Sequence, residues 1–374
     1  MTPKVAAFLD SSSLATPFLA LDLEKVADNY ATIRRALPTA KIYYAVKANP
    51  AAPILSLLAN LGSCFDAASI QEIEQCIAVG APAGAISFGN TVKKPSAIAA
   101  AFALGVPLYA FDSIEELQKI ALHAPGSKVY CRIAVNNAGA EWPLSKKFGT
   151  TLNLARDLML KAGDLGLIPY GLSFHVGSQQ TATDAYELAI SEVAMLFTDL
   201  KAAGIELKML NLGGGFPIRY QDDVPSTDMF GDVIMHAMTS HFGNDLPDML
   251  IEPGRAMVGN AGVVAAEVVL VCRRMPEDER RWVYLDIGRF GGLAETEGEA
   301  IRYNITSGAG ATGPVVLAGP SCDGVDIMYE KTPYRLPLGL QAGERVLIHN
   351  AGAYVTSYAS QNFNGFTPLA EYYL

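Results

Sequence analysis

The sequence predicts an α/β protein that combines a (β/α)8 TIM-like barrel with a C-terminal antiparallel β domain. Between residues 41 and 252, short apolar strands alternate with helical patterns, and from Gly259 onward strands follow one another without helices between them. Strands that alternate with helices form parallel sheets, and eight such units close into a barrel. Strands joined without helices usually pair antiparallel. A doubly wound open sheet is the alternative fold for the first part of the chain.

The segment Lys41–Pro50 starts this alternation and is predicted to be a short strand. Lys47 lies late in it and, by strand alternation, shares a face with Tyr43. A lysine at this place is either a solvated strand end or an amine held in a pocket for chemistry. A strand at residues 18–23 and a helical pattern through Leu37 precede the segment.

The predicted barrel has eight strands and seven intervening helical segments. Its strands end near Lys47, Asp66, Gly89, Asp112, Arg132, His175, Gly213 and Glu252. Its helical segments span residues 53–62, 69–80, 94–105, 113–124, 151–166, 184–204 and 227–243. Several open on Ser, Thr or Asp, which cap helix N-termini, and several stop at Gly.

The composition is that of a globular protein with two or three domains. The chain has 374 residues, of which 50% are hydrophobic and 18% are charged. A formal charge of −10 without a basic run argues against a nucleic-acid partner, and the apolar windows are too short to span a membrane. Five scattered cysteines without a CxxC pair fit free thiols and exclude an ordinary zinc cluster. With no signal segment before Asp10, we expect a cytoplasmic protein without a metal site.

Residues able to do chemistry end six of the predicted barrel strands. They are Lys47, Asp66, Arg132, His175, the run Gly213–Gly215, and Glu252. Each has an ordinary explanation by itself, such as a helix cap for Asp66 or a satisfied rim histidine for His175. In a barrel, however, the C-terminal ends of all strands meet at one face, where active sites form. Six such residues at one mouth therefore predict an active site.

Two glycine turns, LNLGGGFP at 210–217 and EPGR at 252–255, follow the seventh and eighth strands. Consecutive glycines let backbone N–H groups approach an anion, and barrels commonly bind phosphate after these two strands. A tight turn without a ligand is the alternative, and Ile218 departs from the dinucleotide fingerprint. A phosphate site beside a lysine, a carboxylate and a histidine indicates pyridoxal 5'-phosphate. The lysine would bind its aldehyde as a Schiff base, and the carboxylate would keep its ring nitrogen protonated.

Seven motifs resemble those of the fold-type III pyridoxal-phosphate decarboxylases of ornithine, lysine, arginine and diaminopimelate, and most closely the ornithine decarboxylase branch. They are YAVKANP, FDAAS, FHVGSQ, LGGGFP, EPGR, GPSCDGVD and NAGAY, and the resemblance covers about residues 15–372. It implies an alanine-racemase-like barrel at 25–260 that binds the cofactor. It also implies a β domain, formed by 1–24 and 261–374, that completes the active site across a homodimer. Alanine racemase itself shares only the AVKAN start.

The resemblance also assigns roles at the cofactor. Lys47 would hold the cofactor, His175 would stack on its ring, and Glu252 would pair with its ring nitrogen. The cofactor-binding residues implied in this way are Lys47, Asp66, Arg132, His175, Ser178, Gly213, Gly214, Gly215, Glu252, Gly254, Arg255 and Tyr354. The phosphate would be held by Ser178, Gly215, Gly254, Arg255 and Tyr354.

GPSCDGVD supplies residues that, by the same resemblance, enter the site of the neighbouring subunit. Cys322 would act as a catalytic residue beside Lys47 and His175 by controlling protonation after CO2 leaves. Asp323 would bind the distal ammonium of a basic amino acid, with Tyr354 also contacting the substrate. Lys147 and Asp326 resemble an ion pair across the dimer.

A second carboxylate for the distal amine is implied within residues 292–303, where Glu295, Glu297 and Glu299 compete and ungapped matching favours Glu299. The implied reaction is the decarboxylation of L-ornithine to putrescine, in polyamine biosynthesis, with L-lysine to cadaverine as a second activity. Dual lysine/ornithine specificity and diaminopimelate decarboxylation are the alternatives, although the latter looks for a Cys-Glu pair. A non-catalytic, decarboxylase-like regulatory protein is an alternative of another class, which the retained site residues disfavour.

Overall fold

The computed structural model describes residues 1–136, 138–142 and 147–374, which form two compact units. The barrel unit comprises Ala27–Pro217 and Val224–Met257. The β unit comprises Met1–Val26, Ile218–Asp223 and Val258–Leu374. The segment 218–223 therefore leaves the barrel unit and returns to it within a few residues.

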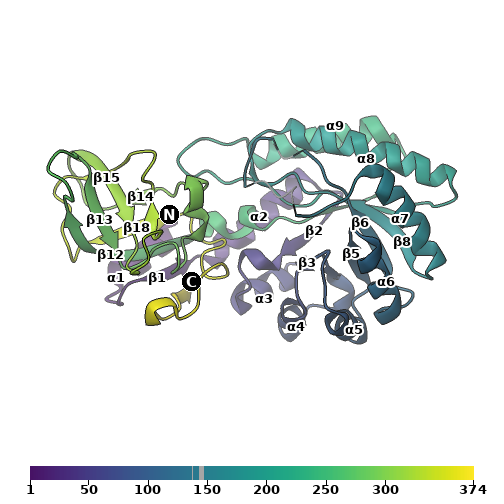
Figure 1. Cartoon of the computed structure of the whole chain (residues 1–374), viewed down its shortest axis with the longest axis horizontal. Coiled ribbons are helices and arrows are strands. Elements are labelled where there is room, and N and C mark those ends of the chain that lie inside the picture. Colours follow the sequence, from purple (N-terminus) through teal and green to yellow (C-terminus); the bar gives the residue numbers. More distant parts are fainter. Residues whose placement is uncertain (137, 143–146) are drawn as a thin grey trace. The chain divides into compact units, whose positions relative to one another are not determined.

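Eight parallel strands close into a barrel in the order β10-β11-β2-β3-β4-β5-β6-β8 (Figure 1). Their bounds are β2 (Ala40–Ala45), β3 (Cys64–Ala67), β4 (Ile86–Phe88), β5 (Leu108–Phe111), β6 (Lys128–Arg132), β8 (Ile168–Ser173), β10 (Met209–Asn211) and β11 (Asp248–Ile251). The predicted (β/α)8 barrel is confirmed, and the doubly wound open sheet is excluded because β10 and β11 close the circle onto β8 and β2.

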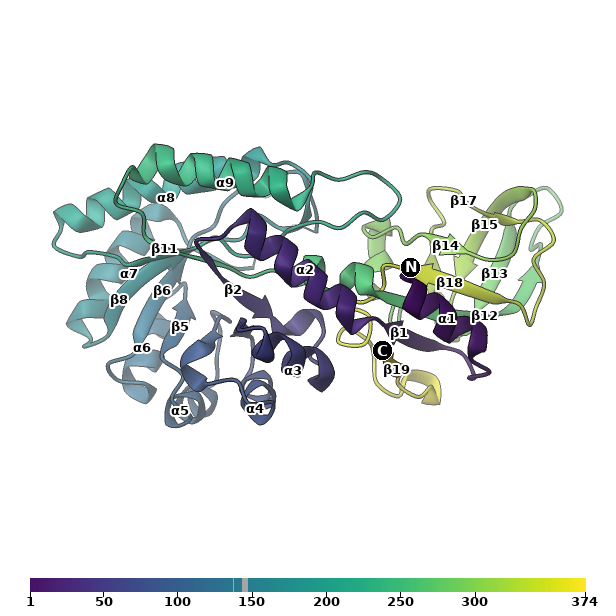
Figure 2. The same cartoon turned by 180° about the vertical axis from the view of Figure 1, so that it is seen from behind.

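Helices surround the barrel in both views (Figures 1 and 2). They are α2 (Leu23–Ala36), α3 (Ala52–Asn60), α4 (Ile70–Ala78), α5 (Pro95–Ala103), α6 (Ile114–His123), α7 (Leu152–Asp164), α8 (Asp184–Ala202), α9 (Thr227–Phe242) and the short α10 (Arg255–Val258). Three of the predicted caps are present. Thr151 Oγ1 accepts a hydrogen bond from the N–H of Leu154 at 3.4 Å. Ser69 Oγ accepts a hydrogen bond from the N–H of Glu72 at 3.2 Å, and Ser113 Oγ accepts one from the N–H of Glu116 at 3.3 Å.

Side chains fill the inside of the barrel, so it is a core and not a pore. One buried cluster within it comprises Tyr43, Leu108, Ala110, Tyr130, Met209 and Leu250. The strand register aligns the residues at the C-terminal ends: Asp66 is paired with Ala45, and Ser173 is paired with both Arg132 and Asn211. Chemistry is therefore confined to the end of the barrel where these residues emerge.

The predicted strand at Lys41–Pro50 is wrong at its C-terminal end. β2 stops at Ala45, and Val46–Ala48 form a single 3-10 turn, η1. Two hydrogen bonds bend the chain here: Tyr44 Oη donates to the carbonyl of Asn49 at 2.9 Å, and the N–H of residue 51 donates to Asn49 Oδ1 at 3.1 Å. Lys47 therefore lies on the turn that leaves the strand and does not share a strand face with Tyr43.

A buried ion pair anchors the loop between β4 and α5 at the mouth of the barrel. Lys93 Nζ is fully buried and donates to the carbonyls of Asn90 at 2.7 Å and Ala110 at 2.6 Å, and lies 2.9 Å from Glu116 Oε1. Burial lowers the pKa of Lys93 to about 8. Removing one partner of such a pair costs about 3–5 kcal/mol, so this loop, which begins with Gly89, is firmly held.

The β unit contains a nine-stranded sheet built on the long strand β12 (Gly262–Cys272). Its other strands are β1 (Phe18–Leu21), β13 (Arg281–Leu285), β14 (Ile305–Thr306), β15 (Thr312–Ala318), β16 (Ile327–Met328), β17 (Tyr334–Pro337), β18 (Arg345–His349) and β19 (Ala370–Tyr373). The sheet is mixed and not purely antiparallel as predicted, because β1 pairs with β19, and β13 with β15, in parallel. Long connections make this arrangement possible, since β1 and β19 come from opposite ends of the chain.

Several short elements were not anticipated. Helix α1 (Pro3–Ser11) packs Val5 and Leu9 into the core of the β unit against Phe18 and Val263. The further elements are the strands β7 (Ala140–Trp142) and β9 (Ser178–Gln180), which pair with each other, and the 3-10 turns η2 (Ala83–Ala85), η3 (Gly259–Ala261), η4 (Ala294–Glu299) and η5 (Phe363–Gly365). Of these, β9 and η4 carry residues that the sequence assigns to the site.

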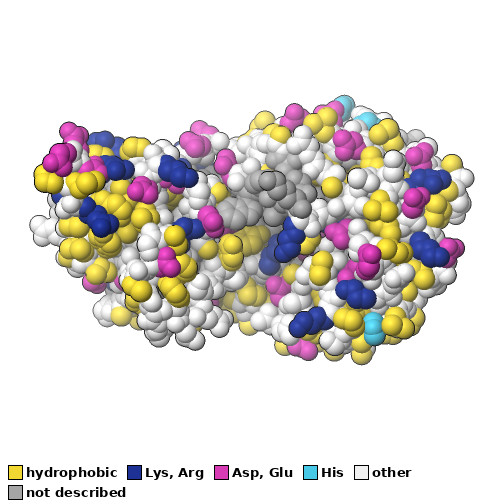
Figure 3. Space-filling view, in the orientation of Figure 1, with side chains coloured by type: hydrophobic (Ala, Val, Ile, Leu, Met, Phe, Trp, Pro, Cys, Tyr) yellow, Lys and Arg dark blue, Asp and Glu magenta, His cyan; other side chains and the backbone are white. Residues whose placement is uncertain are grey.

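The described surface shows no dominant charge of one sign on the face in Figure 3, where acidic and basic side chains are interspersed with small hydrophobic groups. A continuous basic surface, which nucleic acids require, is not seen among the described residues on this face. No helix in the described ranges has the length and apolar character needed to cross a lipid bilayer.

Candidate active site

Five of the predicted site residues meet at the C-terminal end of the barrel: Lys47, Asp66, Arg132, His175 and Glu252. They lie close enough for the charges of some to shift the pKa values of others. The charges of Glu252, Lys47 and Arg132 all shift the pKa of Asp66. The charges of Arg132 and Lys47 lower the pKa of His175. Five strands thus deliver two cations, two carboxyl groups and an imidazole to one place.

Asp66 is a buried carboxyl group at the end of β3 and is only 8% exposed. Burial and the nearby carboxylate of Glu252 raise the pKa of Asp66 well above its usual range, although Lys47 and Arg132 oppose them. Its Oδ1 has no hydrogen-bond partner among the described residues. A Cβ at Gly89 would lie 1.9 Å from this oxygen, so only glycine fits beside it. A buried polar atom without a partner fits a site that receives a polar ligand.

His175 lies just beyond β8 with its ring orientation fixed. Its Nδ1 accepts a hydrogen bond from the N–H of Gly177 at 2.9 Å, so in the neutral ring the hydrogen is on Nε2. Burial lowers the pKa of His175 well below its usual range, and the charges of Arg132 and Lys47 lower it further. A neutral, flat and immobile ring is suited to stacking on an aromatic ligand, which is the role the sequence predicts.

The glycines after β10 form a cradle in which no side chain fits. A Cβ at Gly213 would lie 2.3 Å from the carbonyl oxygen of Phe174, and one at Gly215 would lie 2.4 Å from that of Gly177. Both glycines have positive φ, at +66° and +114°. Tyr186 Oη donates to the carbonyl of Gly214 at 2.8 Å and holds the loop from behind. Such a loop exposes backbone rather than side chains, which suits a phosphate.

Arg255 and Ser178 lie next to this cradle. Arg255, at the start of α10, is only 3% exposed, and its Nη2 donates to Ser178 Oγ on β9 at 3.0 Å. The N–H of Gln180 on the same strand donates to the carbonyl of Gly215 at 2.9 Å. Gly254 lies in the turn before α10, where its carbonyl accepts the N–H of residue 257. The structure thus brings the predicted phosphate ligands of the barrel unit together, with a guanidinium among them.

Glu252 is held by a residue that the sequence analysis did not single out. Asn211, the last residue of β10, donates from Nδ2 to Glu252 Oε1 at 2.5 Å. Its Oδ1 accepts the N–H of Gly213 at 2.9 Å. The signal was present in the sequence, because an asparagine at the end of an apolar strand, two residues before three glycines, is buried only if its amide has partners.

The CDGVD loop of the β unit has exposed residues at 322–325 and is held by hydrogen bonds of the buried Asp326. Asp326 is 2% exposed, and its carboxylate accepts hydrogen bonds from Ser321 Oγ at 2.7 Å and from the N–H of Arg289 at 2.8 Å. Cys322 and Asp323 are exposed on the same loop. Asp326 therefore shapes the loop that presents them, and its ion pair with Lys147 of another subunit stays a prediction.

The three candidate glutamates in η4 differ in their contacts. The carboxylate of Glu299 accepts the N–H of Lys331 at 2.6 Å and pairs with Arg302 Nη1 at 3.2 Å. The side chain of Glu297 is 64% exposed, and Glu295 is only 5% exposed. The carboxylate of Glu299 thus already binds the backbone of residue 331 and the side chain of Arg302. Matching of the sequence alone does not reveal these contacts.

Tyr354 lies in the loop after β18 with a positive φ of +57°. Left-handed backbone at a non-glycine residue is uncommon and collects at ligand sites, where the surroundings enforce it. The conformation is compatible with the predicted role of Tyr354 at the phosphate and the substrate.

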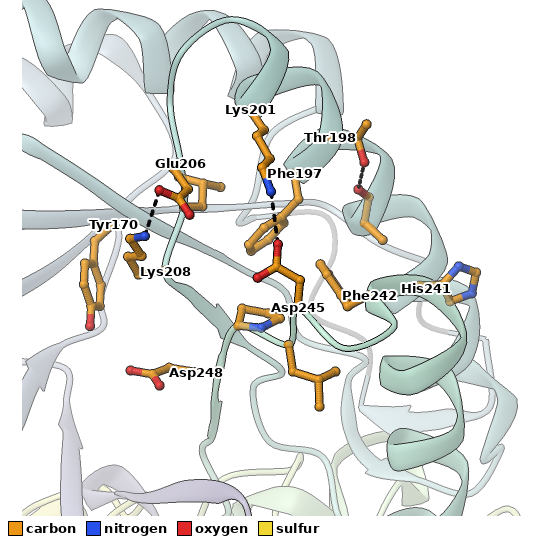
Figure 4. Close-up of a pocket in the computed structure, with 14 residues that line it drawn as sticks. Tyr170, Phe197, Thr198, Lys201, Glu206, Lys208, His241, Phe242, Asp245 and Asp248 are labelled. Carbon is orange, nitrogen blue, oxygen red and sulfur yellow. Dashed lines mark hydrogen bonds and ion pairs between the residues drawn. The ribbon is translucent and has the colours of Figure 1, made fainter.

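A pocket of about 650 Å³ opens at the other end of the barrel, around the starts of β8, β10 and β11 (Figure 4). Four of its charged side chains form two ion pairs: Lys201 lies 3.0 Å from Asp245, and Lys208 lies 2.9 Å from Glu206. None of the predicted site residues lines it. Since TIM-barrel chemistry takes place at the C-terminal end of the strands, this pocket is not the active site.

Comparison with known proteins agrees with the chemistry of the barrel mouth. Residues 23–259 match the family model described as pyridoxal-dependent decarboxylase, pyridoxal binding domain. A lysine/ornithine decarboxylase of Selenomonas ruminantium is 38% identical over 356 residues, covering 94% of this chain and 88% of the relative. An antizyme inhibitor 2 of Xenopus laevis is 33% identical over 371 residues, covering 95% and 80%. A crystal structure of a lysine/ornithine decarboxylase from Vibrio vulnificus, complexed with putrescine, superimposes with a TM-score of 0.88 at 29% identity, covering 99% of this chain and 97% of that one.

Proposed function

The chain belongs to the family of pyridoxal-dependent decarboxylases, and we propose that it converts L-ornithine to putrescine and, less efficiently, L-lysine to cadaverine. Its cofactor is pyridoxal 5'-phosphate, and its substrates are basic amino acids. The observation that carries the proposal is the exposed carboxylate of Asp323 on a loop that hydrogen bonds of the buried Asp326 hold in place. A fixed anion is what a distal ammonium needs for recognition. The names of the Selenomonas and Vibrio relatives support both substrates.

The barrel mouth fits this cofactor group by group. Lys47 would bind its aldehyde, and the glycine cradle with Arg255 and Ser178 would bind its phosphate. Glu252 would accept the N–H of the protonated ring, and the neutral ring of His175 would lie against its face. When bound, the cofactor supplies a protonated ring that withdraws the electron pair left behind by CO2. Every remaining task falls to side chains of the protein.

The β unit would supply the groups that act on the substrate. Asp323 would bind the distal ammonium, which places the α-carboxylate for loss. The Cys322 thiol would then deliver a proton to the carbon that has lost CO2. Because both residues are exposed in the described chain, we propose a homodimer in which they serve the site of the neighbouring subunit. The five cysteines are all unpaired, which suits a reducing cytoplasm.

A panel of substrates tests the proposal. Release of CO2 is to be measured with ornithine, lysine, arginine and diaminopimelate under the same conditions. We expect ornithine to have the highest kcat/KM, and lysine to be measurable, because one methylene is worth only about 1–3 kcal/mol of discrimination. A preference for diaminopimelate would overturn the assignment of Asp323, and a preference for lysine would reverse the order of the two substrates.

A regulatory protein that acts by binding is the second candidate, because one relative bears the name antizyme inhibitor. The residues of the barrel mouth disfavour it. Lys47, His175 and Glu252 are all present, and the last two have hydrogen-bond partners that orient them, which supports a catalytic role. Absence of CO2 release from all four substrates, by protein that carries the cofactor, would favour the binding role.

Replacing Asp323 by asparagine should weaken selection of the distal ammonium. The change removes one charge at nearly constant shape, and the new amide oxygen can still accept the N–H of Val325, which now donates to Asp323 Oδ1 at 2.9 Å. We expect kcat/KM for ornithine to fall roughly 30- to 1000-fold, which corresponds to a loss of about 2–4 kcal/mol of transition-state stabilisation. The exposed Glu330→Gln is the charge-matched control. An equal loss of kcat/KM for norleucine, which has no distal amine, would contradict the role of Asp323.

Shortening Glu299 and Glu295 separately should distinguish the two as the second distal-amine carboxylate. Since Glu299 already supports the backbone of residue 331, we expect Glu299→Asp to lower the free energy of unfolding by about 1–3 kcal/mol. We expect Glu295→Asp to change the lysine-to-ornithine ratio of kcat/KM by about tenfold. The opposite outcome, with the ratio changed only by Glu299→Asp, would restore Glu299, which ungapped matching of the sequence favours.

A further inference from the structure

We propose that Asn211 is a positioning residue that holds Glu252 in the orientation in which it meets the ring nitrogen of the cofactor. The inference rests on the role proposed above for Glu252 and deepens it. Asn211 is 1% exposed. It is the last residue of β10, which pairs with β8 on one side and with β11 on the other. It acts on the cofactor only through its neighbours.

Three hydrogen bonds join Asn211, Gly213 and Glu252 in a closed circuit. The N–H of Gly213 donates to Asn211 Oδ1 at 2.9 Å, and Asn211 Nδ2 donates to Glu252 Oε1 at 2.5 Å. The circuit closes where the N–H of Glu252 donates to the carbonyl of Gly213 at 2.8 Å. Each residue is thereby held by both of the others.

The circuit gives the amide of Asn211 a direction. Because Gly213 presents an N–H, the amide must turn its oxygen to Gly213 and its NH2 group to Glu252. A donor aimed at Oε1 stabilises the ionised carboxylate, and it leaves Oε2 for another donor. An aspartate at position 211 would satisfy Gly213 equally well but would confront Glu252 with a second negative charge.

The other charged groups near Glu252 include both an acid, Asp66, and a base, Arg132. Its carboxylate acts to raise the pKa of Asp66 on β3 and the pKa values of Tyr130 and Arg132 on β6. A guanidinium attracts a carboxylate, whereas a second carboxyl group does not. Asn211 adds a fixed dipole that does not titrate. It also ties the carboxylate to Gly213, the first residue of the phosphate cradle, so the groups for the two ends of the cofactor share one anchor.

A pair of cofactors tests the inference without measuring turnover. The full-length protein, freed of cofactor, is titrated with pyridoxal 5'-phosphate and with its 1-deaza analogue, in which carbon replaces the ring nitrogen. The wild type should prefer the natural cofactor, because only the ring nitrogen can use Glu252. In Asn211→Leu this preference should fall by about tenfold or more, since a hydrogen bond to a charged group is worth that much. A purely structural role would weaken both ligands alike.

Asn211→Asp provides a second variant of the same shape. At neutral pH the preference for the natural cofactor should fall, because an ionised carboxylate at position 211 cannot donate a hydrogen bond to Glu252 and repels it. At mildly acidic pH it should recover, since the introduced carboxyl group, once protonated, can donate to Glu252 as the amide does. Asn29→Asp is the matched control: Asn29 is also a buried asparagine, but its amide donates to the carbonyl of Met257 at 2.9 Å.

Glu252→Gln separates failure of this inference from failure of the proposed function. If Glu252→Gln keeps the wild-type preference between the two ligands, Glu252 does not face the ring nitrogen and the proposed role itself fails. If Glu252→Gln loses the preference while both Asn211 variants keep it, Asn211 is not a positioning residue. Loss of the preference in all three variants, with the Asn29→Asp control unchanged, supports the circuit.

Discussion

Replacing Lys47 by alanine is expected to abolish decarboxylation and covalent attachment of the cofactor together, with turnover reduced roughly 10³-fold or more. The reason is the position of Lys47 on η1, the turn at the exit of β2, where its charge acts on both Asp66 and His175. An amine at that point lies among groups that fit the ring of the cofactor. A phosphate held by the glycine cradle cannot replace the bond that the amine makes.

Borohydride reduction followed by mass spectrometry of peptides measures the attachment directly. The mass of the cofactor should appear on the peptide that contains Lys47 in the wild type, and on no peptide of Lys47→Ala. Lys41→Ala is the matched control, because Lys41 lies near the start of β2, the strand that leads to η1, in an exposed ion pair with Asp248 at 3.5 Å. Such pairs contribute only about 0–1 kcal/mol, so this variant should retain full attachment. A reducible adduct that survives in Lys47→Ala would place the attachment at another lysine.

The barrel could be predicted because its signal is repeated along the chain. Eight apolar strands and the capped helices between them each suggest the same βα unit, so an error in one does not change the fold. The ends of strands lie outside this logic, since single side-chain contacts decide them. At η1 the hydrogen bonds of Asn49 end the strand before Lys47. The alternation of residues along the strand does not indicate these hydrogen bonds.

The residues at the strand ends were predictable because barrel topology alone collects them at one face. The contacts between them were not, because they depend on three-dimensional packing of residues far apart in the chain. Asn211 meets Glu252 across 41 positions of sequence. Glu299 is engaged by backbone N–H groups 32 and 33 residues away, which no local motif indicates. The mixed β sheet has the same origin, since its parallel pairs join distant strands.

Two inactive variants, Lys47→Ala and Cys322→Ala, are expected to restore each other's activity when their subunits exchange. Lys47 belongs to the barrel unit and Cys322 to the β unit, where its loop leaves it exposed. If the site takes Lys47 from one subunit and Cys322 from its partner, each mixed dimer contains one site with both residues intact. Half of the dimers are mixed after random exchange, so activity should recover to roughly a quarter of the wild-type value.

The matched control for this experiment mixes Lys47→Ala with His175→Ala. Both residues belong to the barrel unit, so every site in the mixed dimer lacks one of them and no recovery is expected. Exchange itself is to be verified by mass spectrometry of subunits that carry different tags. If exchange is complete and the Lys47→Ala and Cys322→Ala mixture stays at the level of its parents, each site is built from one chain. Recovery in the first mixture and not in the second would instead mean that the thiol of Cys322 reaches its site from the neighbouring subunit.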